Sequence, residues 1–267
     1  MEIRRGNVLS ENERQVAAES LLEAERSRVV IPQLSQTFPG MNIEDAYDVQ
    51  RRWAEARVAG GARIVGRKIG LTSRAMQLAS KMTEPDYGVI FDDAIYKDGA
   101  SIAAKKFIKA RLETELAFIM GADLSGSGCQ MHDVMRATEF VTPALEIIDY
   151  RTEVPRAIVD TIADNAAFGA IVLGGRIFRP FDIDVRWVAA TLSKNGVIEE
   201  SGVSAAIMGH PAAGIAWLIN KLALLGDGLR KGDIVLGGSF TRPIDIVTGD
   251  VVFADYGPLG SIGVSFD

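Results

Sequence analysis

The stretch RLETELAF (residues 111–118) alternates apolar and polar side chains, which is the period of a β-strand. This alternation puts Glu113 and Glu115 on one face of the strand, where two like charges repel each other. Either that face meets water, or a positive charge lies between the two carboxylates.

The sequence around this strand predicts a strand-dominated α+β fold with a helical N-terminal part. Residues 10–28 form an amphipathic pattern with Ser10 as a capping residue, and a second helix is predicted after Asn42. Beyond these helices, short strand-like runs recur to the end of the chain, with a hairpin predicted at Asn195-Gly196. We therefore expect an N-terminal helical segment, residues 1–60, packed on a catalytic domain, residues 61–267.

Composition excludes several classes of protein. The 267 residues carry a formal charge of −6, which argues against nucleic acid or an anionic membrane as a partner. Cys129 is the single cysteine, so the chain has no internal disulfide, and a reducing cytoplasm is expected. With His132 and His210 as the two histidines, a multi-histidine zinc site is excluded, and His210 is expected at a helix start.

A third carboxylate, Glu146, lies in the apolar run PALEIID (residues 143–149). Burying a carboxylate alone is prohibitive, so Glu146 is either at an edge or paired. Three carboxylates from two strands suit a hard divalent cation that prefers oxygen ligands. The alternative is that Glu113 and Glu115 are solvated and Glu146 is an edge residue.

Three further segments contain candidate functional residues. In VGRKIGLTS (residues 65–73), Lys68 alternates with glycines, so it is either an exposed edge lysine or faces an anionic ligand. In EPDYG (residues 84–88), the turn projects Asp86, which either stabilises the turn or takes part in a site. In GGSFTRP (residues 237–243), Arg242 either clamps a carboxylate or lies on the surface.

Taken together, these segments resemble the hydratase/decarboxylase family of the fumarylacetoacetase-like superfamily, from about residue 41 to the C-terminus. The motifs that carry the resemblance, in chain order, are GRKIGLTSRAMQ, EPDYGVIFDD, RLETELAF, PALEIIDYR, DTIADNAAFG, NGVIEESG, GHPAAGIAWLINKLA, LGGSFTRP and DYGPLGSIGVSF. The resemblance implies a mixed β-sandwich roll. It also implies Mg²⁺ or Mn²⁺ held by Glu113, Glu115 and Glu146, with Lys68 and Asp86 at the catalytic centre.

The resemblance also implies an activity, the hydration of a 2-oxo-enoate or 2-hydroxydienoate in aromatic meta-cleavage catabolism. The EPDYG and GGSFTRP segments are similar to those of members that convert 2-oxohept-4-ene-1,7-dioate to 4-hydroxy-2-oxoheptanedioate in the homoprotocatechuate pathway. We expect Thr72 and Ser239 to bind the C1 carboxylate of this small 2-oxo acid and Arg242 the distal one. We also expect a homo-oligomer, and consider a complex with another enzyme of the pathway.

Three alternatives stay open at this point. Two use the same scaffold: a decarboxylase of the 4-oxalocrotonate type, and a hydratase of 2-hydroxypentadienoate. The third is of another class, a non-catalytic metal-binding scaffold subunit. Release of CO₂ separates the decarboxylase from a hydratase, and absence of turnover would identify the scaffold.

Overall fold

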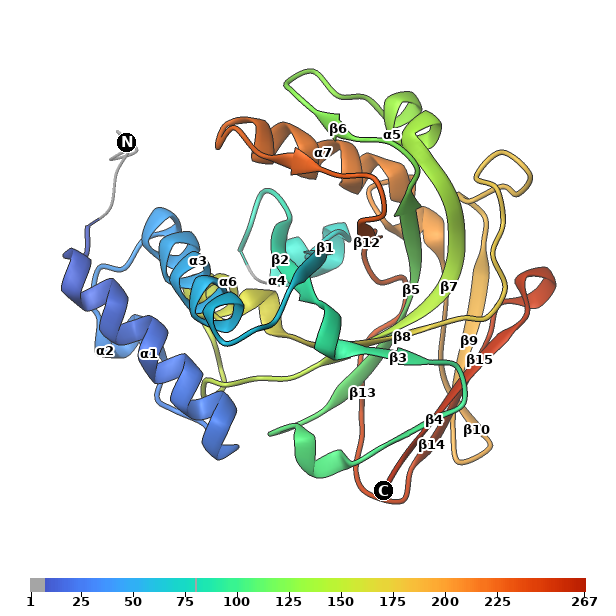
Figure 1. Ribbon diagram of the computed structural model, residues 1–267. Helices are drawn as coiled ribbons and strands as arrows, with labels where there is room; N and C mark the ends of the chain where they lie inside the picture. Colours follow the sequence, from blue (N-terminus) through green and yellow to red (C-terminus); the bar gives the residue numbers. More distant parts are fainter. Residues whose placement is uncertain (1–7, 80) are drawn as a thin grey trace.

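The computed structural model describes residues 8–79 and 81–267, which form a mixed α/β fold with several sheets and a helical N-terminal part, as expected (Figure 1). The α-helices are α1 (Glu11–Ser27), α2 (Leu34–Thr37), α3 (Ile43–Ala59), α4 (Arg74–Ala79), α5 (Met131–Ala137), α6 (Ile158–Ala163) and α7 (Pro211–Ala223). None of the helices in the described residues is long and apolar enough to cross a membrane.

The larger sheet holds the strand that opened the sequence analysis. Its order is β2 (Asp86–Phe91), β1 (Ile64–Gly70), β12 (Ile234–Leu236), β5 (Arg111–Met120), β7 (Thr138–Ile148), β8 (Phe168–Leu173) and β3 (Ile95–Lys97), with β13 (Ile244–Asp245) also paired to β5. Strand β5 pairs antiparallel with β7 along nearly its whole length, so both strands lie inside the sheet. This central pair is the frame on which the site is built.

A second sheet packs beside the first and closes the apolar core. Its order is β10 (Val197–Val203), β9 (Ala189–Lys194), β14 (Val251–Asp255), β15 (Ser261–Phe266) and β4 (Ala100–Ile102), and a small pair joins β11 (Gly228–Leu229) to β6 (Leu124–Ser125). The β9–β10 turn is the predicted hairpin, with positive φ of 53° at Asn195 and 83° at Gly196. Buried side chains of both sheets and of α7 form one cluster, which includes Phe118, Leu218 and Phe266.

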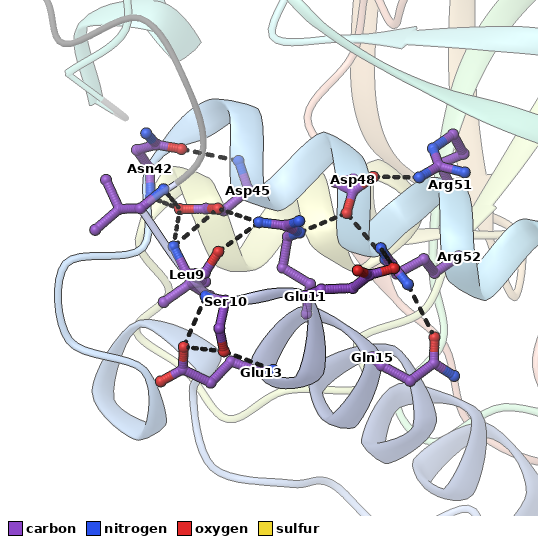
Figure 2. A network of polar contacts seen from close by, with 12 residues as sticks. Leu9, Ser10, Glu11, Glu13, Gln15, Asn42, Asp45, Asp48, Arg51 and Arg52 are labelled. Atoms are coloured by element: carbon purple, nitrogen blue, oxygen red, sulfur yellow. Dashed lines mark hydrogen bonds and ion pairs between the residues drawn. The ribbon is translucent and has the colours of Figure 1, made fainter.

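Helices α2 and α3 pack on α6, α1 packs on α3, and α3 also contacts β2 (Figure 1). Both predicted caps are present, because Ser10 and Asn42 each accept a hydrogen bond from the third backbone N–H of their helix. Polar contacts hold α1 to α3 (Figure 2): the fully buried carboxylate of Asp45 accepts from the backbone N–H of Leu9 at 3.2 Å.

Two features of α3 fix its position on the strand that carries Asp86. Trp53 packs against Phe91 of β2 with ring centroids 5.6 Å apart. The amide of Gln50 donates to the backbone carbonyl of Tyr87 at 2.9 Å and to that of Ile162 at 2.8 Å. Helix α3 thus packs against β2, the strand that carries Asp86. The domain boundary at residue 60 stays a prediction.

His210 lies at the predicted helix start. It is the N-cap of α7, and its Nδ1 accepts from the backbone N–H of Ala212 at 3.1 Å. Burial lowers the pKa of His210, and the charge of Arg186 lowers it further. A neutral imidazole is the form that can accept this bond.

Candidate active site and metal centre

The pairing of β5 with β7 brings the three glutamates together. Glu113 lies directly opposite Glu146 in the antiparallel register, and Glu115 lies two residues along the same face of β5. Ligand oxygens of the three carboxylates lie within 4.8 Å of one another. Glu115 and Glu146 are fully buried and Glu113 is partly buried, so the picture of solvated and edge glutamates does not describe this cluster.

The electrostatics of the cluster require a positive charge. Burial, followed by the charge of Glu146, raises the pKa of Glu113 to about 8. Burial also raises the pKa values of Glu115 and Glu146. Among the described residues, buried oxygens Glu115 Oε1 and Glu146 Oε2 have no hydrogen-bond partner. A hard divalent cation supplies both the missing charge and a partner for these oxygens, so the residues present fit such an ion.

Lys68 and Asp86 adjoin the cluster from the neighbouring strands β1 and β2. Lys68 Nζ lies 3.1 Å from Glu146 Oε1. Asp86 is the register partner of Gly70, and a Cβ added at Gly70 would lie 2.2 Å from Asp86 Oδ1 and 3.5 Å from Lys68 Nζ. The bare backbone at Gly70 therefore leaves room for the Asp86 carboxylate beside the lysine, and Lys68 is not an exposed edge residue.

The two groups have opposite charges and unusual proton affinities. Burial lowers the pKa of Lys68, but the charges of Glu146, Asp86 and Glu113 outweigh it, and the net shift is upward. Burial raises the pKa of Asp86, and the charge of Lys68 offsets only part of that rise. Lys68 thus stays an ammonium at neutral pH, and the carboxyl group of Asp86 binds a proton more tightly than that of an ordinary aspartate.

Thr72 and Ser239 lie near the cluster, where Gly238 approaches Thr72 closely. Gly238 has φ of +120°, and a Cβ there would lie 2.2 Å from Thr72 Oγ1. The Gly238 N–H donates to Glu115 Oε2 at 2.8 Å, and a hydrogen bond from Ser239 lowers the pKa of Glu113. Both predicted substrate-contacting residues therefore lie beside the carboxylates.

Arg242 is not brought to this cluster. Its side chain is 81% exposed, and its Nη2 pairs with Glu200 Oε1 of β10 at 2.9 Å. The chain turns outward after Ser239 because Thr241 is held inside: the Thr241 Oγ1 accepts from the backbone N–H of Thr114 at 3.0 Å. Of the two alternatives considered for Arg242, a carboxylate clamp or a surface residue, the structure shows a surface residue.

The structure assigns a role to the motif DTIADNAAFG (residues 160–169), for which the sequence analysis proposed no functional residue. Asn165, Ala166 and Ala167 all have positive φ, between 51° and 61°, which is strained for residues other than glycine. The Ala166 carbonyl accepts from Lys68 Nζ at 2.7 Å, and the Asn165 amide bonds both the N–H and the C=O of Val89. The strained turn orients Lys68, and no composition or period in this stretch would have revealed it.

Comparisons with known proteins agree with this geometry. The family model for the fumarylacetoacetate (FAA) hydrolase C-terminal region matches residues 63–265. A 2-oxo-hept-4-ene-1,7-dioate hydratase of Escherichia coli is 48% identical over 93% of this chain and 96% of that protein. A 2-keto-4-pentenoate hydratase of Paraburkholderia xenovorans is 35% identical over 97% of both chains. The structure of 4-oxalocrotonate decarboxylase from Pseudomonas putida G7, complexed with magnesium and adipate, matches with a TM-score of 0.95, 33% identity, and coverage of 98% and 100% of the two chains.

Proposed function

The chain belongs to the fumarylacetoacetate (FAA) hydrolase C-terminal family, and we propose that it is a divalent-metal-dependent hydratase acting on 2-oxo-hept-4-ene-1,7-dioate. The reaction adds water across a double bond and gives 4-hydroxy-2-oxoheptanedioate. The substrate is supported by the E. coli hydratase, which is 48% identical over nearly the full length of both chains.

One observation carries the chemistry. Three glutamates from two strands converge within 4.8 Å, and Lys68 and Asp86 lie at their border. Glu113, Glu115 and Glu146 would hold Mg²⁺ or Mn²⁺, with coordination positions left for water and substrate. When bound, the cation would supply Lewis acidity toward the 2-oxo group and charge compensation for the C1 carboxylate.

The residues of the chain then move the protons. The Lys68 ammonium holds its proton at neutral pH and stabilises negative charge on the 2-oxo oxygen as the dienol form reacts. Asp86 delivers a proton to C5 while the 2-hydroxyl of the dienol releases its proton to solvent, which yields a conjugated enone. Asp86 then accepts a proton from the water that adds at C4, and a proton taken up from solvent at C3 completes the product. The raised pKa of Asp86 suits both transfers, because a carboxyl group with a higher proton affinity is a better base and keeps its proton over a wider pH range. Thr72 and Ser239 orient the C1 carboxylate.

Direct assay of the products tests this proposal. The purified protein is incubated with 2-hydroxyhepta-2,4-diene-1,7-dioate and Mg²⁺, with EDTA as the control, and products are identified by NMR. The expected result is metal-dependent formation of 4-hydroxy-2-oxoheptanedioate without CO₂. No turnover of any C5, C6-dioic or C7-dioic 2-hydroxydienoate would refute an enzymatic role and favour a scaffold subunit.

The second candidate is a decarboxylase, favoured by the solved structure of 4-oxalocrotonate decarboxylase, with a TM-score of 0.95. The same carboxylate cluster would stabilise the charge left on the substrate after loss of CO₂. Stoichiometric CO₂ release from 4-oxalocrotonate, with no hydrated product, would establish this reaction in place of hydration.

The same proposal includes the identity of the metal ion, the oligomeric state, the compartment and the pathway. Both Mg²⁺ and Mn²⁺ fit an all-oxygen ligand set, and titration of the metal-free protein with each ion separates them. We further propose a homo-oligomer that works in the cytoplasm within the homoprotocatechuate pathway, with another enzyme of that pathway as a candidate partner. These features rest on the family resemblance of the sequence motifs.

A further inference from the structure

A cavity of about 920 Å³ opens beside the carboxylate cluster. Among the described residues that line it, one is acidic, Asp245, and four are basic: Lys81, Lys109, Arg111 and Arg156. This positive lining contrasts with the formal charge of −6 on the whole chain. A cavity of this kind attracts anions.

Residues that line the cavity adjoin residues of the candidate active site. Arg111 lies on the same face of β5 as Glu113, and its charge lowers the pKa of that glutamate. Arg156 acts on Asp86 in the same way. Leu71, which lines the cavity, immediately precedes Thr72 at the rim of the cluster. A ligand held at the cluster can therefore extend into the basic cavity.

Three of the four basic side chains either have partners within the protein or are exposed to solvent. Arg111 has several partners: its Nε is ion-paired with Asp245 Oδ1 at 3.0 Å without a hydrogen bond, and its two Nη groups donate to the Tyr150 hydroxyl at 3.2 Å and the Pro243 carbonyl at 3.0 Å. The side chains of Lys81 and Lys109 are exposed to solvent, where a charge contributes little to binding.

Arg156 differs from these three. Its side chain is 11% exposed, and its guanidinium lies 3.8 Å from the centre of the Tyr150 ring. Its buried Nη1 has no hydrogen-bond partner among the described residues. The carboxylate that it faces, Asp164, lies 3.6 Å away and already accepts from the Arg151 backbone N–H at 2.9 Å and Nη1 at 2.7 Å. Asp164 is thus shared by two guanidinium groups, although Glu25 Oε2 also lies 3.9 Å from Arg151 Nε, and Arg156 is left with an unused donor and a shared counter-charge.

We propose that Arg156, held over the Tyr150 ring, binds the distal carboxylate of a dicarboxylate substrate and so selects diacids over monoacids. The inference rests on the proposed function, because it takes the 2-oxo end of the substrate to lie at the carboxylate cluster. In a C7 diacid, five bonds separate C2 from C7, which span about 6 Å at the ~1.2 Å advance per bond of an extended chain. The planar fork of arginine matches a carboxylate bidentately. Arg156 therefore takes the role that the sequence suggested for Arg242.

Binding measurements test this without requiring turnover. Calorimetry with Mg²⁺ compares 2-oxoheptanedioate with 2-oxopentanoate, which has the same 2-oxo end and no distal carboxylate. Loss of a charge-assisted contact is worth about 1.5–3 kcal/mol, so Arg156→Met should weaken the diacid roughly 10- to 150-fold. Affinity for 2-oxopentanoate should change less than about threefold, since that acid never reaches Arg156.

A matched control separates this effect from the loss of any buried arginine. Arg52 of α3 has a 16% exposed side chain and an ion pair of 2.9 Å with Asp48, and it lies in the network of Figure 2 away from the cavity. Arg52→Met should bind both acids like the wild type. If Arg156→Met does not fold, Arg156→Lys keeps the charge beside Asp164 and loses the fork, and it should weaken the diacid roughly tenfold.

Several outcomes would overturn the proposal. Equal weakening of both acids by Arg156→Met would make Arg156 a structural residue, and unchanged diacid affinity would remove it from the site. Selective loss of the diacid in Arg242→Leu, with Arg156→Met unaffected, would return the role to Arg242. A wild type that prefers the diacid but turns over no dienoate would refute the proposed function and leave this inference standing.

Discussion

Raising the pH should destabilise the metal-free protein, because the carboxylate cluster holds protons that the unfolded chain releases. The pKa of Glu113 is about 8 in the folded protein and 4.5 in a model peptide. Between these values the folded state binds more protons than the unfolded state, so the free energy of unfolding falls as the pH rises. Binding of Mg²⁺ should oppose this fall, because the cation stabilises the ionised carboxylates.

The fall in the free energy of unfolding is best measured between pH 6.5 and 8. The lowered pKa of His210 makes stability rise with pH, which is the opposite sign, until the unfolded imidazole has lost its proton about one pH unit above its ordinary pKa of ~6.5. Between pH 6.5 and about 7.5 this rise offsets a small part of the fall. One additional proton held by the folded state corresponds to about 1.4 kcal/mol per pH unit, or ~2 kcal/mol across this window. For a chain of this size the expected decrease in Tm is about 4–8 °C.

Thermal unfolding followed by circular dichroism at pH 6.5, 7 and 8, with EDTA or with Mg²⁺, measures the effect. Glu113→Gln should reduce the pH dependence of the metal-free protein, because it removes one of the titrating groups. Glu139→Gln, an exposed glutamate on the same β7 strand as Glu146, is the matched control and should behave like the wild type. A Tm that stays constant or rises with pH in EDTA would refute the charged-cluster argument.

Three further substitutions test individual parts of the site. Glu146→Gln keeps the shape but removes a charge, so Mg²⁺ affinity by calorimetry and turnover should both collapse while the fold persists; unchanged Mg²⁺ binding would exclude Glu146 as a ligand. Lys68→Met should still bind metal but reduce kcat by roughly two orders of magnitude or more in a steady-state assay, and near-wild-type turnover would leave Lys68 with a structural role only. Gly70→Ala places a Cβ 2.2 Å from Asp86 Oδ1, so we expect at least a tenfold lower kcat with Mg²⁺ affinity retained; equal loss of both would indicate a general distortion.

The sequence was most informative where a local period decides the outcome. Alternation over residues 111–118 predicted strand β5 and placed Glu113 and Glu115 on one face, and both lie there. Helix caps at Ser10 and Asn42 were equally readable, because a cap depends on a few neighbouring residues. The register that sets Glu146 opposite Glu113 depends on pairing across the sheet, which no local pattern contains.

Side-chain direction in loops was harder to predict. Ser239 and Arg242 are three residues apart, yet one lies by the cluster and the other pairs with Glu200 on the surface. Arg156 follows a proline in a loop and has no periodic context, so its place in the cavity emerges only when β7 and α6 are positioned. Family resemblance named residues at the catalytic centre, but it did not assign the distal end of the substrate.

The charges around the site explain why a cation is needed at that distal end. When all are ionised, four carboxylates and one ammonium give the inner site a formal charge of −3 (Glu113, Glu115, Glu146, Asp86 and Lys68). A divalent cation reduces this to −1, which still repels a dianionic substrate. The charge of Arg111 is already paired with Asp245. Among the described residues Arg156 has a single ion-pair partner, Asp164, which it shares with Arg151, whereas Arg151 also lies 3.9 Å from Glu25. A diacid is therefore favoured only if its second carboxylate reaches the incompletely compensated Arg156, whereas a monoacid gains nothing from that charge.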